Sequence, residues 1–346
     1  MKSQETLFEK APAANWNEAY PVGNGRIGAM VFDGTADDVV AFSEDTLWSG
    51  RPDSSYPVVL KDHLPGLRRL LRAGKYTQAS QRFWKICGEK PGPGFRDSAV
   101  FVTAGNLHII ADDPGARVYT RTLDLRRAVD TCSFSGTSGK ITSTAFCSYP
   151  DAVFVKRIRS AKPRGYRLGF DSPVKGAVSA AGRELHFDGV CPAWARQTST
   201  ATYETPDGQT GISFRVAVRA VAPGAVFRAE DNRLVINGAR DLLLLVAIRS
   251  NFKDCDTNPE ASDIDFRAQC RADLDRAEAR GCDALLKAHA ADVGSLYDRS
   301  RLALDAPAAE AALPTGALIE RSPGKKSAPT TLIALLYNFG RYLMIA

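Results

Sequence analysis

The sequence predicts a mainly β protein: a large antiparallel β-sandwich, or supersandwich, followed by a helical segment. Between residues 100 and 251, runs rich in Val, Ile, Thr, Tyr and Phe alternate with the turn formers Gly, Pro, Asn and Asp. No helical pattern interrupts these runs, which favours an antiparallel sandwich over a parallel α/β sheet. Residues 242–246 read LLLLV and are apolar on both faces, so we expect this strand to lie centrally between packed layers.

The strand signal is clearest in segments that turn residues separate from one another. These segments are 107–110, 117–125, 140–146, 152–158, 166–170, 211–221 and 242–248.

A helical insertion is expected near residues 60–86. Leucines recur at helical spacing over 60–71, and Gly74 stands where that helix should end. A second apolar series follows over 76–86. We interpret the pair as an amphipathic cover on the sheet.

A second helical region begins near Asn258 and is interrupted at Gly281. From Cys282 to Tyr297, apolar residues recur with the period of an amphipathic helix. His289 lies on that apolar face, and nothing nearby in the sequence completes a catalytic or metal site. We therefore interpret His289 as a packed core histidine.

These patterns suggest three parts: a sandwich domain over 1–256, a helical linker over 257–305 and a further segment over 306–346. Residues 306–329 are rich in Ala and Pro, as in a linker that crosses a surface. Residues 331–346 form a helix that is apolar around nearly its whole circumference, and such helices are normally buried on all sides. Without neighbours the helix would favour self-association, and truncation near Asp305 should then improve solubility.

Composition excludes several classes of function. The chain has 346 residues, 44% hydrophobic and 24% charged, with a net charge of +6. Basic residues are scattered among acidic ones, so we expect no nucleic-acid partner. The seven cysteines are odd in number and include no Cys-x-x-Cys pair, which argues against a disulfide framework and a metal site. No run reaches the roughly 20 apolar residues of a membrane span, and no signal peptide is visible, so the default expectation is a cytoplasmic protein without a membrane partner.

A glycine-punctuated stretch near the N-terminus is the candidate site. Residues 23–28 read GNGRIG, and residues 44–50 read EDTLWSG. One interpretation is a binding loop, because Arg26, Glu44, Asp45 and Trp48 are side chains of the kind that line sugar sites. The alternative is a plain pair of strands in which Trp16 and Trp48 anchor the core. The glycine spacing also fits a dinucleotide fingerprint, but no strand precedes it and no helix follows, so we reject nucleotide binding.

The order of these motifs resembles glycoside hydrolase family 95, the α-L-fucosidases. Residues 21–30, PVGNGRIGAM, and 43–50, SEDTLWSG, are similar to the opening segments of that family, although Ser43 stands where the family has Asn. Residues 105–108, 119–125 and 146–151 are similar to later motifs in the same order. Residues 143–145 replace the family's Thr-Arg-Glu, so any salt bridge from that Arg is lost.

The resemblance implies an enzyme that removes terminal α-L-fucosyl residues from a fucosylated oligosaccharide or polysaccharide by an inverting mechanism, without a cofactor. It also implies that residues 306–346 are the truncated start of a catalytic (α/α)6 barrel whose acid and base lie beyond this chain. No catalytic residue is assigned, and the isolated chain is expected to be inactive. We expect Asn24, Arg26, Glu44 and Trp48 to bind substrate on the face toward the barrel, with structural packing as the equal alternative.

The sequence contains two pairs of adjacent acids and is compatible with two further functions. Glu44 with Asp45, and Asp112 with Asp113, are adjacent on strands and should point to opposite faces, so we interpret them as surface or turn carboxylates. A non-catalytic sugar-binding module could stack sugars on Trp16, Trp48 or Trp194. A related phosphorylase acting on α-glucosides is a third possibility. The EDTLWSG segment favours the fucosidase over the phosphorylase, and the linker with its last helix favours it over the binding module.

Overall fold

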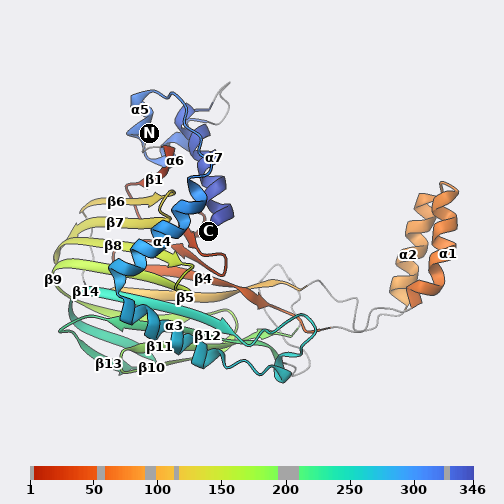
Figure 1. Ribbon diagram of the computed structural model, residues 1–346, viewed down its shortest axis with the longest axis horizontal. Helices are drawn as coiled ribbons and strands as arrows, with labels where there is room; N and C mark the ends of the chain where they lie inside the picture. Colours follow the sequence, from red (N-terminus) through yellow and green to blue (C-terminus); the bar gives the residue numbers. More distant parts are fainter. Residues whose placement is uncertain (1–3, 53–58, 90–98, 113–116, 194–209, 323–327) are drawn as a thin grey trace.

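The computed structural model describes residues 4–52, 59–89, 99–112, 117–193, 210–322 and 328–346. It is a large antiparallel β-sandwich flanked by helices, as the strand-rich sequence predicts (Figure 1). The strands are β1 (Thr6–Glu9), β2 (Tyr20–Gly23), β3 (Ile27–Val31), β4 (Asp37–Trp48), β5 (Phe101–Ala111), β6 (Arg117–Asp124), β7 (Val129–Gly136), β8 (Gly139–Ser148), β9 (Val153–Asp171), β10 (Lys175–Ala181), β11 (Glu184–Pro192), β12 (Thr210–Val221), β13 (Val226–Glu230) and β14 (Arg233–Ser250). The helices are α1 (Val59–Arg72), α2 (Tyr76–Glu89), α3 (Phe266–Arg280), α4 (Cys282–Tyr297), α5 (Ala308–Ala311), α6 (Thr315–Glu320) and α7 (Thr330–Ile345), with short 3-10 turns at Trp16–Glu18 and Pro259–Ala261.

Two long strands join the layers of the sandwich. One layer follows the order β1-β6-β7-β8-β9-β14-β12-β11-β10, and the other contains β2-β3-β4-β5. The first half of β9 pairs with β8, whereas its second half pairs with β5. Strand β14 likewise pairs with β13 near its start and with β12 near its end. The two layers therefore share strands and enclose one core.

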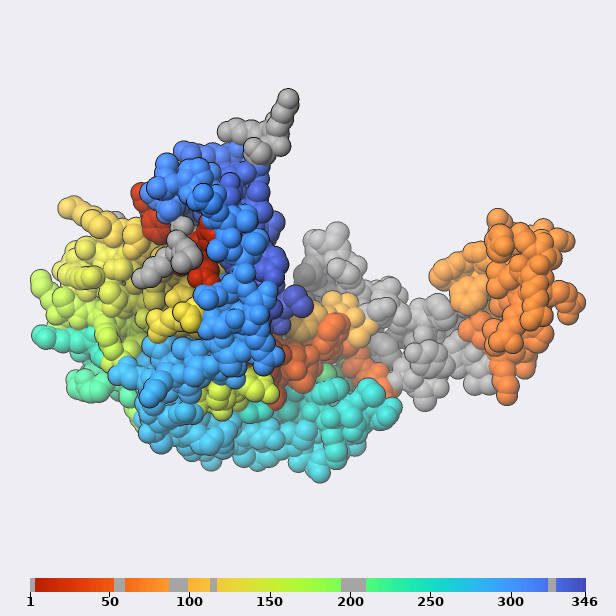
Figure 2. Space-filling view, turned by 45° about the horizontal axis from the view of Figure 1, so that its top comes forward, coloured from red at the N-terminus to blue at the C-terminus, as the bar shows by residue number. Residues whose placement is uncertain are grey.

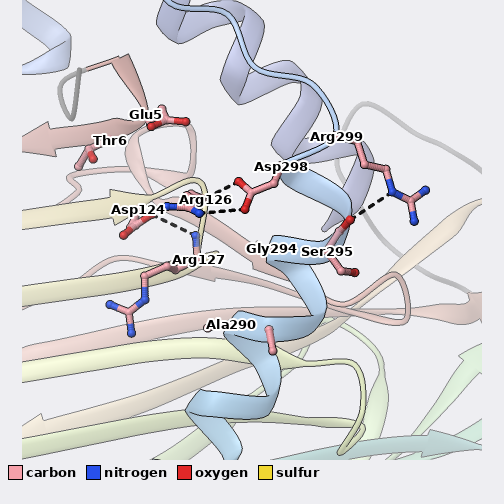
Figure 3. Close-up of a pocket in the computed structure, with 11 residues that line it drawn as sticks. Glu5, Thr6, Asp124, Arg126, Arg127, Ala290, Gly294, Ser295, Asp298 and Arg299 are labelled. Atoms are coloured by element: carbon pink, nitrogen blue, oxygen red, sulfur yellow. Dashed lines mark hydrogen bonds and ion pairs between the residues drawn. The ribbon is translucent and has the colours of Figure 1, made fainter.

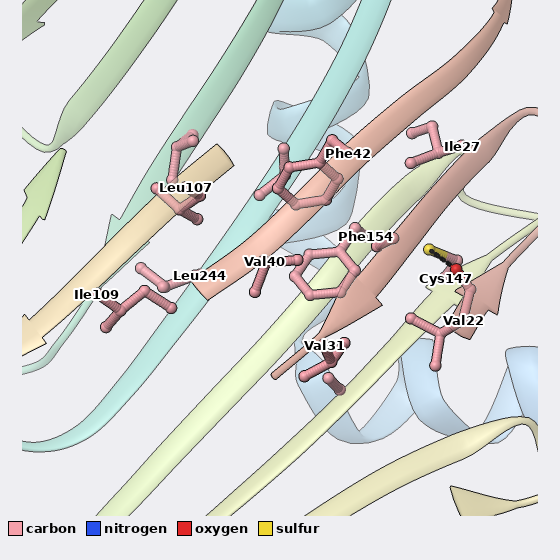
Figure 4. Close-up of a cluster of buried hydrophobic side chains, with 14 of the residues drawn as sticks. Val22, Ile27, Val31, Val40, Phe42, Leu107, Ile109, Cys147, Phe154 and Leu244 are labelled. Atoms are coloured by element: carbon pink, nitrogen blue, oxygen red, sulfur yellow. Dashed lines mark hydrogen bonds between the residues drawn. The ribbon is translucent and has the colours of Figure 1, made fainter. Parts of the chain in front are cut away.

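That core is built from the inward faces of both layers. Phe42 of β4 meets Phe154 of β9 edge to face, with ring centroids 5.1 Å apart. Val40, Leu107 and Leu244 surround this contact (Figure 4). The alternation of apolar and polar residues along each strand dictates this arrangement, because successive side chains point to opposite faces.

Strand β14 lies between β9 and β12, and both of its faces are buried as predicted. Leu244 and Val246 face the sandwich core, whereas Leu245 and Ala247 face a second cluster that includes Leu274 of α3. A strand covered on both sides has no solvent face, which explains its continuous apolar run.

Helices α3 and α4 confirm the predicted break at Gly281, whose φ of 77° suits glycine. His289 of α4 is fully buried, stacks on Phe146 with centroids 4.9 Å apart, and lies 3.0 Å through Nε2 from the carbonyl of Ala128. Burial lowers the pKa of His289, so the ring is neutral. His289 is a packed core histidine, as interpreted.

Helix α7 folds back on the sandwich with one face, so it is not covered on all sides. Asn338 donates to the carbonyls of Gln4 and Leu302, each at 2.9 Å, and the Tyr342 hydroxyl donates to Pro21 O at 2.5 Å. The opposite face stays open, with Leu336 69% exposed. The apolar circumference in the sequence did not reveal that the sandwich would cover only part of it.

The α1–α2 hairpin contradicts the expected cover on the sheet. It stands apart from the sandwich, and its helices contact each other (Figures 1 and 2). Leu67 and Ala79 are buried between them, whereas Tyr76 and Trp84 are more than 60% exposed. Amphipathic spacing predicts a buried stripe, and here the partner helix covers part of that stripe instead of the sheet.

Residues 306–329, predicted as a plain linker, carry two short helices in their described part. Helix α6 docks on β1 through Thr315, whose hydroxyl accepts from Phe8 N at 3.0 Å. Six cysteines among the described residues are free thiols. None of the described helices combines the length and the apolarity that crossing a bilayer requires.

Candidate functional site

The candidate site is built around the β3–β4 hairpin, whose register brings its two sequence motifs together. Ile27 of β3 pairs with Glu44 of β4. Just outside that pair, Asp45 N donates to Arg26 O at 3.0 Å. The GNGRIG loop and the EDTLWSG segment therefore lie side by side at the open end of the hairpin.

Asn24 organises the loop from a buried position. Its Oδ1 accepts hydrogen bonds from Arg26 N at 3.1 Å and Ile27 N at 2.8 Å, while its Nδ2 donates to Ser148 O at 2.9 Å. Asparagine commonly closes turns in this way, by bonding to backbone two or three residues on. With these bonds made, the Asn24 side chain positions Arg26 and is not free for a ligand.

Arg26 and Glu44 form an ion pair that reaches from the core to the surface. Arg26 Nη2 lies 2.7 Å from Glu44 Oε1, with side-chain exposures of 32% and 0%. The N–H direction falls outside hydrogen-bond geometry, and Arg26 Nε has no partner among the described residues. The unpartnered Nε is itself buried, so only the exposed part of the guanidinium can meet a ligand oxygen.

The second oxygen of Glu44 is held by a short polar chain. Glu44 Oε2 accepts from Thr46 N at 2.9 Å and from the Thr46 hydroxyl at 2.5 Å, and that hydroxyl lies 2.6 Å from Ser250 Oγ. Burial raises the pKa of Glu44, and the Thr46 hydrogen bonds and the Arg26 charge lower it in part. Buried residues alternate at even positions 38 to 44 of β4, so the alternation could have revealed that Glu44 points inward. It does not extend to Thr46, because Leu47 is buried instead and the pairing with β5 is irregular there.

Trp48 is a half-open platform at the end of β4, not a core anchor. Its side chain is 43% exposed, its Nε1 donates to Asp45 O at 2.9 Å, and its ring meets Phe101 edge to face at 5.3 Å. Trp16, the other expected anchor, is 59% exposed. Strand ends and short turns leave large rings outside the layers even where the sequence looks apolar. Trp194 lies outside the described residues.

Glu44 and Asp45 separate as the alternation along a strand predicts, but one expectation about them was wrong. Glu44 is fully buried while Asp45 is exposed, so Glu44 is not a surface or turn carboxylate. Its inward position on β4 and its Arg26 partner explain the difference. Asp112 is exposed, and Asp113 lies outside the described residues. No cluster of His, Cys, Asp and Glu suited to a metal ion occurs in the described part of the chain.

The largest described cleft lies elsewhere, between the β6–β7 turn and α4 (Figure 3). It has a volume of about 820 Å³ and is lined by charged residues and small residues of α4. Arg126 donates two hydrogen bonds of 2.9 Å to the Asp298 carboxylate. The side chains of Arg127 and Arg299 point away from Asp298 in Figure 3. The charges of Arg126 and Asp298 in this cleft are therefore already paired. None of the four candidate residues lines the cleft.

A more apolar groove of about 510 Å³ lies where the N-terminal segment meets α6 and α7. Its walls include Tyr20, Pro21, Leu335 and Phe339. Its lining likewise includes none of the four candidate residues. The structure thus brings Asn24, Arg26 and Glu44 together at one loop. Trp48 lies four residues further along β4, with its ring separately exposed to solvent.

Comparisons with known proteins now give the family. Residues 7–255 match the family model described as "Glycosyl hydrolase family 65, N-terminal domain". The chain belongs to this family. Residues 281–346 match a second model, "Glycosyl hydrolase family 95 catalytic domain", which confirms the family 95 resemblance.

Curated relatives of this family member carry fucosidase names. The chain is 27% identical to "Alpha-L-fucosidase 2" of Arabidopsis thaliana, covering 97% of this chain and 41% of the relative. It is also 27% identical to "Probable alpha-fucosidase A" of Aspergillus niger, covering 95% and 41%. The chain therefore spans less than half the length of these relatives. In sequence, the chain is thus similar to proteins named as fucosidases.

Among solved structures, the chain is similar to "Putative kojibiose phosphorylase from human microbiome". The TM-score is 0.56 at 11% identity, covering 100% of this chain and 42% of that chain. At this identity the likeness shows the fold alone. It is consistent with a glycosyl hydrolase N-terminal β-sandwich.

Proposed function

We propose that this chain is the β-sandwich portion of an α-L-fucosidase that removes terminal α-L-fucosyl residues from glycans by an inverting mechanism. The observation that carries the proposal is the collinear 27% identity to the Arabidopsis fucosidase over 97% of the chain. Within this proposal the chain divides into a sandwich domain over 1–256, a helical linker over 257–305 and the start of a barrel over 306–346.

An inverting glycosidase needs an acid and a base whose carboxyl groups are about 6.5–9.5 Å apart across the scissile bond. Glu44 is a poor candidate for either role, because it is sealed behind Arg26 and Thr46. Asp45 lies on the opposite face of the strand. We therefore place the acid and base outside these 346 residues and assign none here.

The β3–β4 loop is proposed to support the sugar site. Gly25 N donates to Ala346 O at 2.7 Å, so the loop lies against the end of the segment that matches the family 95 catalytic model. In that position the exposed part of the Arg26 guanidinium can donate to a sugar hydroxyl, and the ion pair with Glu44 orients the guanidinium. Trp48 offers a ring face for stacking, and Asn24 holds the loop.

Arg26→Ala tests this role in any preparation of the protein that shows fucosidase activity. We expect kcat/KM toward an aryl α-L-fucoside to fall at least tenfold, a larger effect than the drop in melting temperature that follows when the buried Glu44 loses its counter-charge. Arg126→Ala, which breaks an exposed ion pair in the cleft of Figure 3, is the matched control and should leave kcat/KM unchanged. A large loss of melting temperature with unchanged kcat/KM would support purely structural packing.

The 346-residue chain by itself should not hydrolyse an aryl α-L-fucoside. Turnover by the pure chain, abolished by a point change that leaves folding intact, would overturn the placement of the acid and base. The alternative function is a non-catalytic carbohydrate-binding or structural module. Retained affinity for fucosylated glycans without turnover in every natural form of the protein would favour that alternative.

A further inference from the structure

A second group of buried charges lies inside the sandwich, at the turn end of the β3–β4 hairpin. Lys156 of β9 is fully buried, and its Nζ lies 2.7 Å from Asp38 Oδ2 and 3.2 Å from Asp33 Oδ1. Asp130 of β7 is also fully buried. We name Asp33, Asp38, Asp130 and Lys156 the core cluster. It ties β7 and β9 of one layer to the β3–β4 hairpin of the other.

The core cluster holds three carboxyl groups but one ammonium group. Lys156 satisfies one oxygen each of Asp33 and Asp38, and Asp38 Oδ1 accepts from Gly34 N at 3.2 Å. In contrast, Asp33 Oδ2 and both oxygens of Asp130 have no partner among the described residues. Lys156 is the cation in ion-pair contact with the cluster among the described residues, so three ionised carboxylates here would leave three buried acceptor oxygens unpaired, which is costly away from water.

Asp33 is among the groups that raise the pKa of Asp130, and both carboxyl groups have buried oxygens without a partner among the described residues. Two ionised carboxylates cannot bond to each other because both only accept, but a single proton lets one donate to the other. We propose that Asp33 and Asp130 share one proton at neutral pH, so that the core cluster is a built-in proton-binding site of the sandwich. Asp130 is the carboxylic acid that donates, and the Asp33 carboxyl accepts while its Oδ1 faces Lys156.

The surroundings agree with this assignment. Burial raises the pKa of Asp130 well above its usual range, and the charge of Asp33 raises it further, while Lys156 lowers it. Burial also raises the pKa of Asp38, to about 6, against the opposing effect of Lys156. The other groups that face the cluster are Tyr20 of β2, Tyr119 and Arg121 of β6, Cys132 of β7, Arg164 of β9 and Tyr342 of α7.

None of these neighbours takes up or releases the proton near neutral pH. Burial raises the pKa values of Tyr20, Tyr119, Cys132 and Tyr342, so all four stay neutral. Arg121 donates to the carbonyls of Ala11 and Glu18, and Arg164 has two nitrogens without a partner among the described residues, but an arginine side chain does not exchange its charge at neutral pH. The proton must therefore reside on the carboxyl groups themselves.

A small cavity beside the core cluster brings further unpartnered polar atoms close to the carboxyl groups. It measures about 20 Å³ and is lined by Asp33, Asp38, Ser143 and Arg164 among others. Ser143 Oγ and Arg164 Nε are buried and have no partner among the described residues. Since a water molecule needs about 10–15 Å³ and two to four polar partners, the cavity fits one water that bridges Arg164 to the carboxyl groups.

A proton held on Asp130 determines how the stability of the fold changes with pH. The folded state keeps a proton on Asp130 that the unfolded chain releases near the usual aspartate pKa of about 4. The folded state then binds one proton more, so its stability falls as pH rises above that value and until Asp130 ionises. One excess proton corresponds to about a tenfold change in the folding equilibrium constant per pH unit.

Asp130→Asn is the direct test, because the amide mimics the protonated acid and can still donate to Asp33. We expect the folding constant of the variant, measured by urea unfolding, to gain about tenfold on that of the wild type for each pH unit above about 5. Asp298→Asn, at a surface ion pair, is the matched control and should show a constant ratio to the wild type over this range. A pH-independent ratio for Asp130→Asn would overturn the proposal.

Infrared spectroscopy with carbon-13-labelled aspartate keeps the test decisive if Asp130→Asn does not fold. The wild type at pH 7 should show the carbonyl stretch of a protonated carboxylic acid, shifted by the label. Glu44→Gln should retain that band because glutamate carries no label, and Asp38→Asn should also retain it because the band belongs to Asp130, although burial raises the pKa of Asp38 as well. Absence of the labelled band from the wild type at pH 7 would refute the shared proton.

Discussion

At one end of the β3–β4 hairpin, Glu44 is fully buried but its partner Arg26 is 32% exposed; at the other end, the side chains of Asp33 and Lys156 are both completely closed off. The open end balances one carboxylate with one guanidinium that still touches solvent. The closed end holds three carboxyls and one ammonium, and we infer that a proton makes up part of the difference. The β3–β4 hairpin therefore carries two groups of charges. The Arg26–Glu44 pair can be reached by a ligand from solvent, whereas the core cluster is closed to any ligand of that size.

This difference teaches that burial of charge is not by itself a sign of a binding site. A ligand needs a polar or charged group that reaches solvent, and the side chain of Arg26 is 32% exposed. The core cluster has unused acceptors without a path, so a proton and a water molecule are the ligands that fit. Substitutions at each end should separate a functional role from a structural one.

Lys156→Met should have the largest effect, because it removes the single ammonium from the closed end. Breaking a buried ion pair by deleting one partner typically costs about 3–5 kcal/mol. We expect the free energy of unfolding in urea to fall by an amount of this order, most strongly at high pH where the carboxyls repel one another. A double variant, Lys156→Met with Asp38→Asn, should recover part of the loss; no recovery would show that the aliphatic stem, not the charge, stabilises the core.

Glu44→Ala should have an intermediate effect at the open end. It leaves the Thr46 hydroxyl without its acceptor and Arg26 without its counter-charge, and an orphaned buried polar group costs about 1–3 kcal/mol. Thermal unfolding measures the loss. Glu44→Gln, which keeps an acceptor for Thr46, is the matched control and should lose less; an equal loss in both variants would mean that the charge on Glu44 dominates.

Trp48→Ala should have the smallest effect on stability. Its ring is nearly half exposed, and the edge-to-face contact with Phe101 contributes about 0.5–1.5 kcal/mol. If Trp48 is a stacking platform, the loss should appear instead in affinity for a fucosylated oligosaccharide, measured by calorimetry on an active preparation. Trp16→Ala, also at an exposed ring, is the comparison; equal affinity losses in both would remove the special role of Trp48.

Much of the fold was determined by the sequence alone. The series of β-prone runs without intervening helices predicted the sandwich, and the doubly apolar run in β14 predicted a strand covered on both faces. The positive φ at Gly281 explains why the break between α3 and α4 was readable. These features are local, because side-chain period and backbone angles depend on near neighbours in the chain. The family followed from the order of short motifs, which is also a property of the sequence.

Only the tertiary structure decided which charges meet. Asp33 and Asp130 are separated by nearly a hundred residues, and no periodicity links them. The alternation along β9 does place Lys156 on the same face as Phe154 and Ile158, so its burial was readable, but its partners were not. The exposure of Trp48 and the separation of the α1–α2 hairpin from the sheet were hidden for the same reason. A sequence period states which face a residue occupies, whereas what covers that face depends on segments distant in the chain.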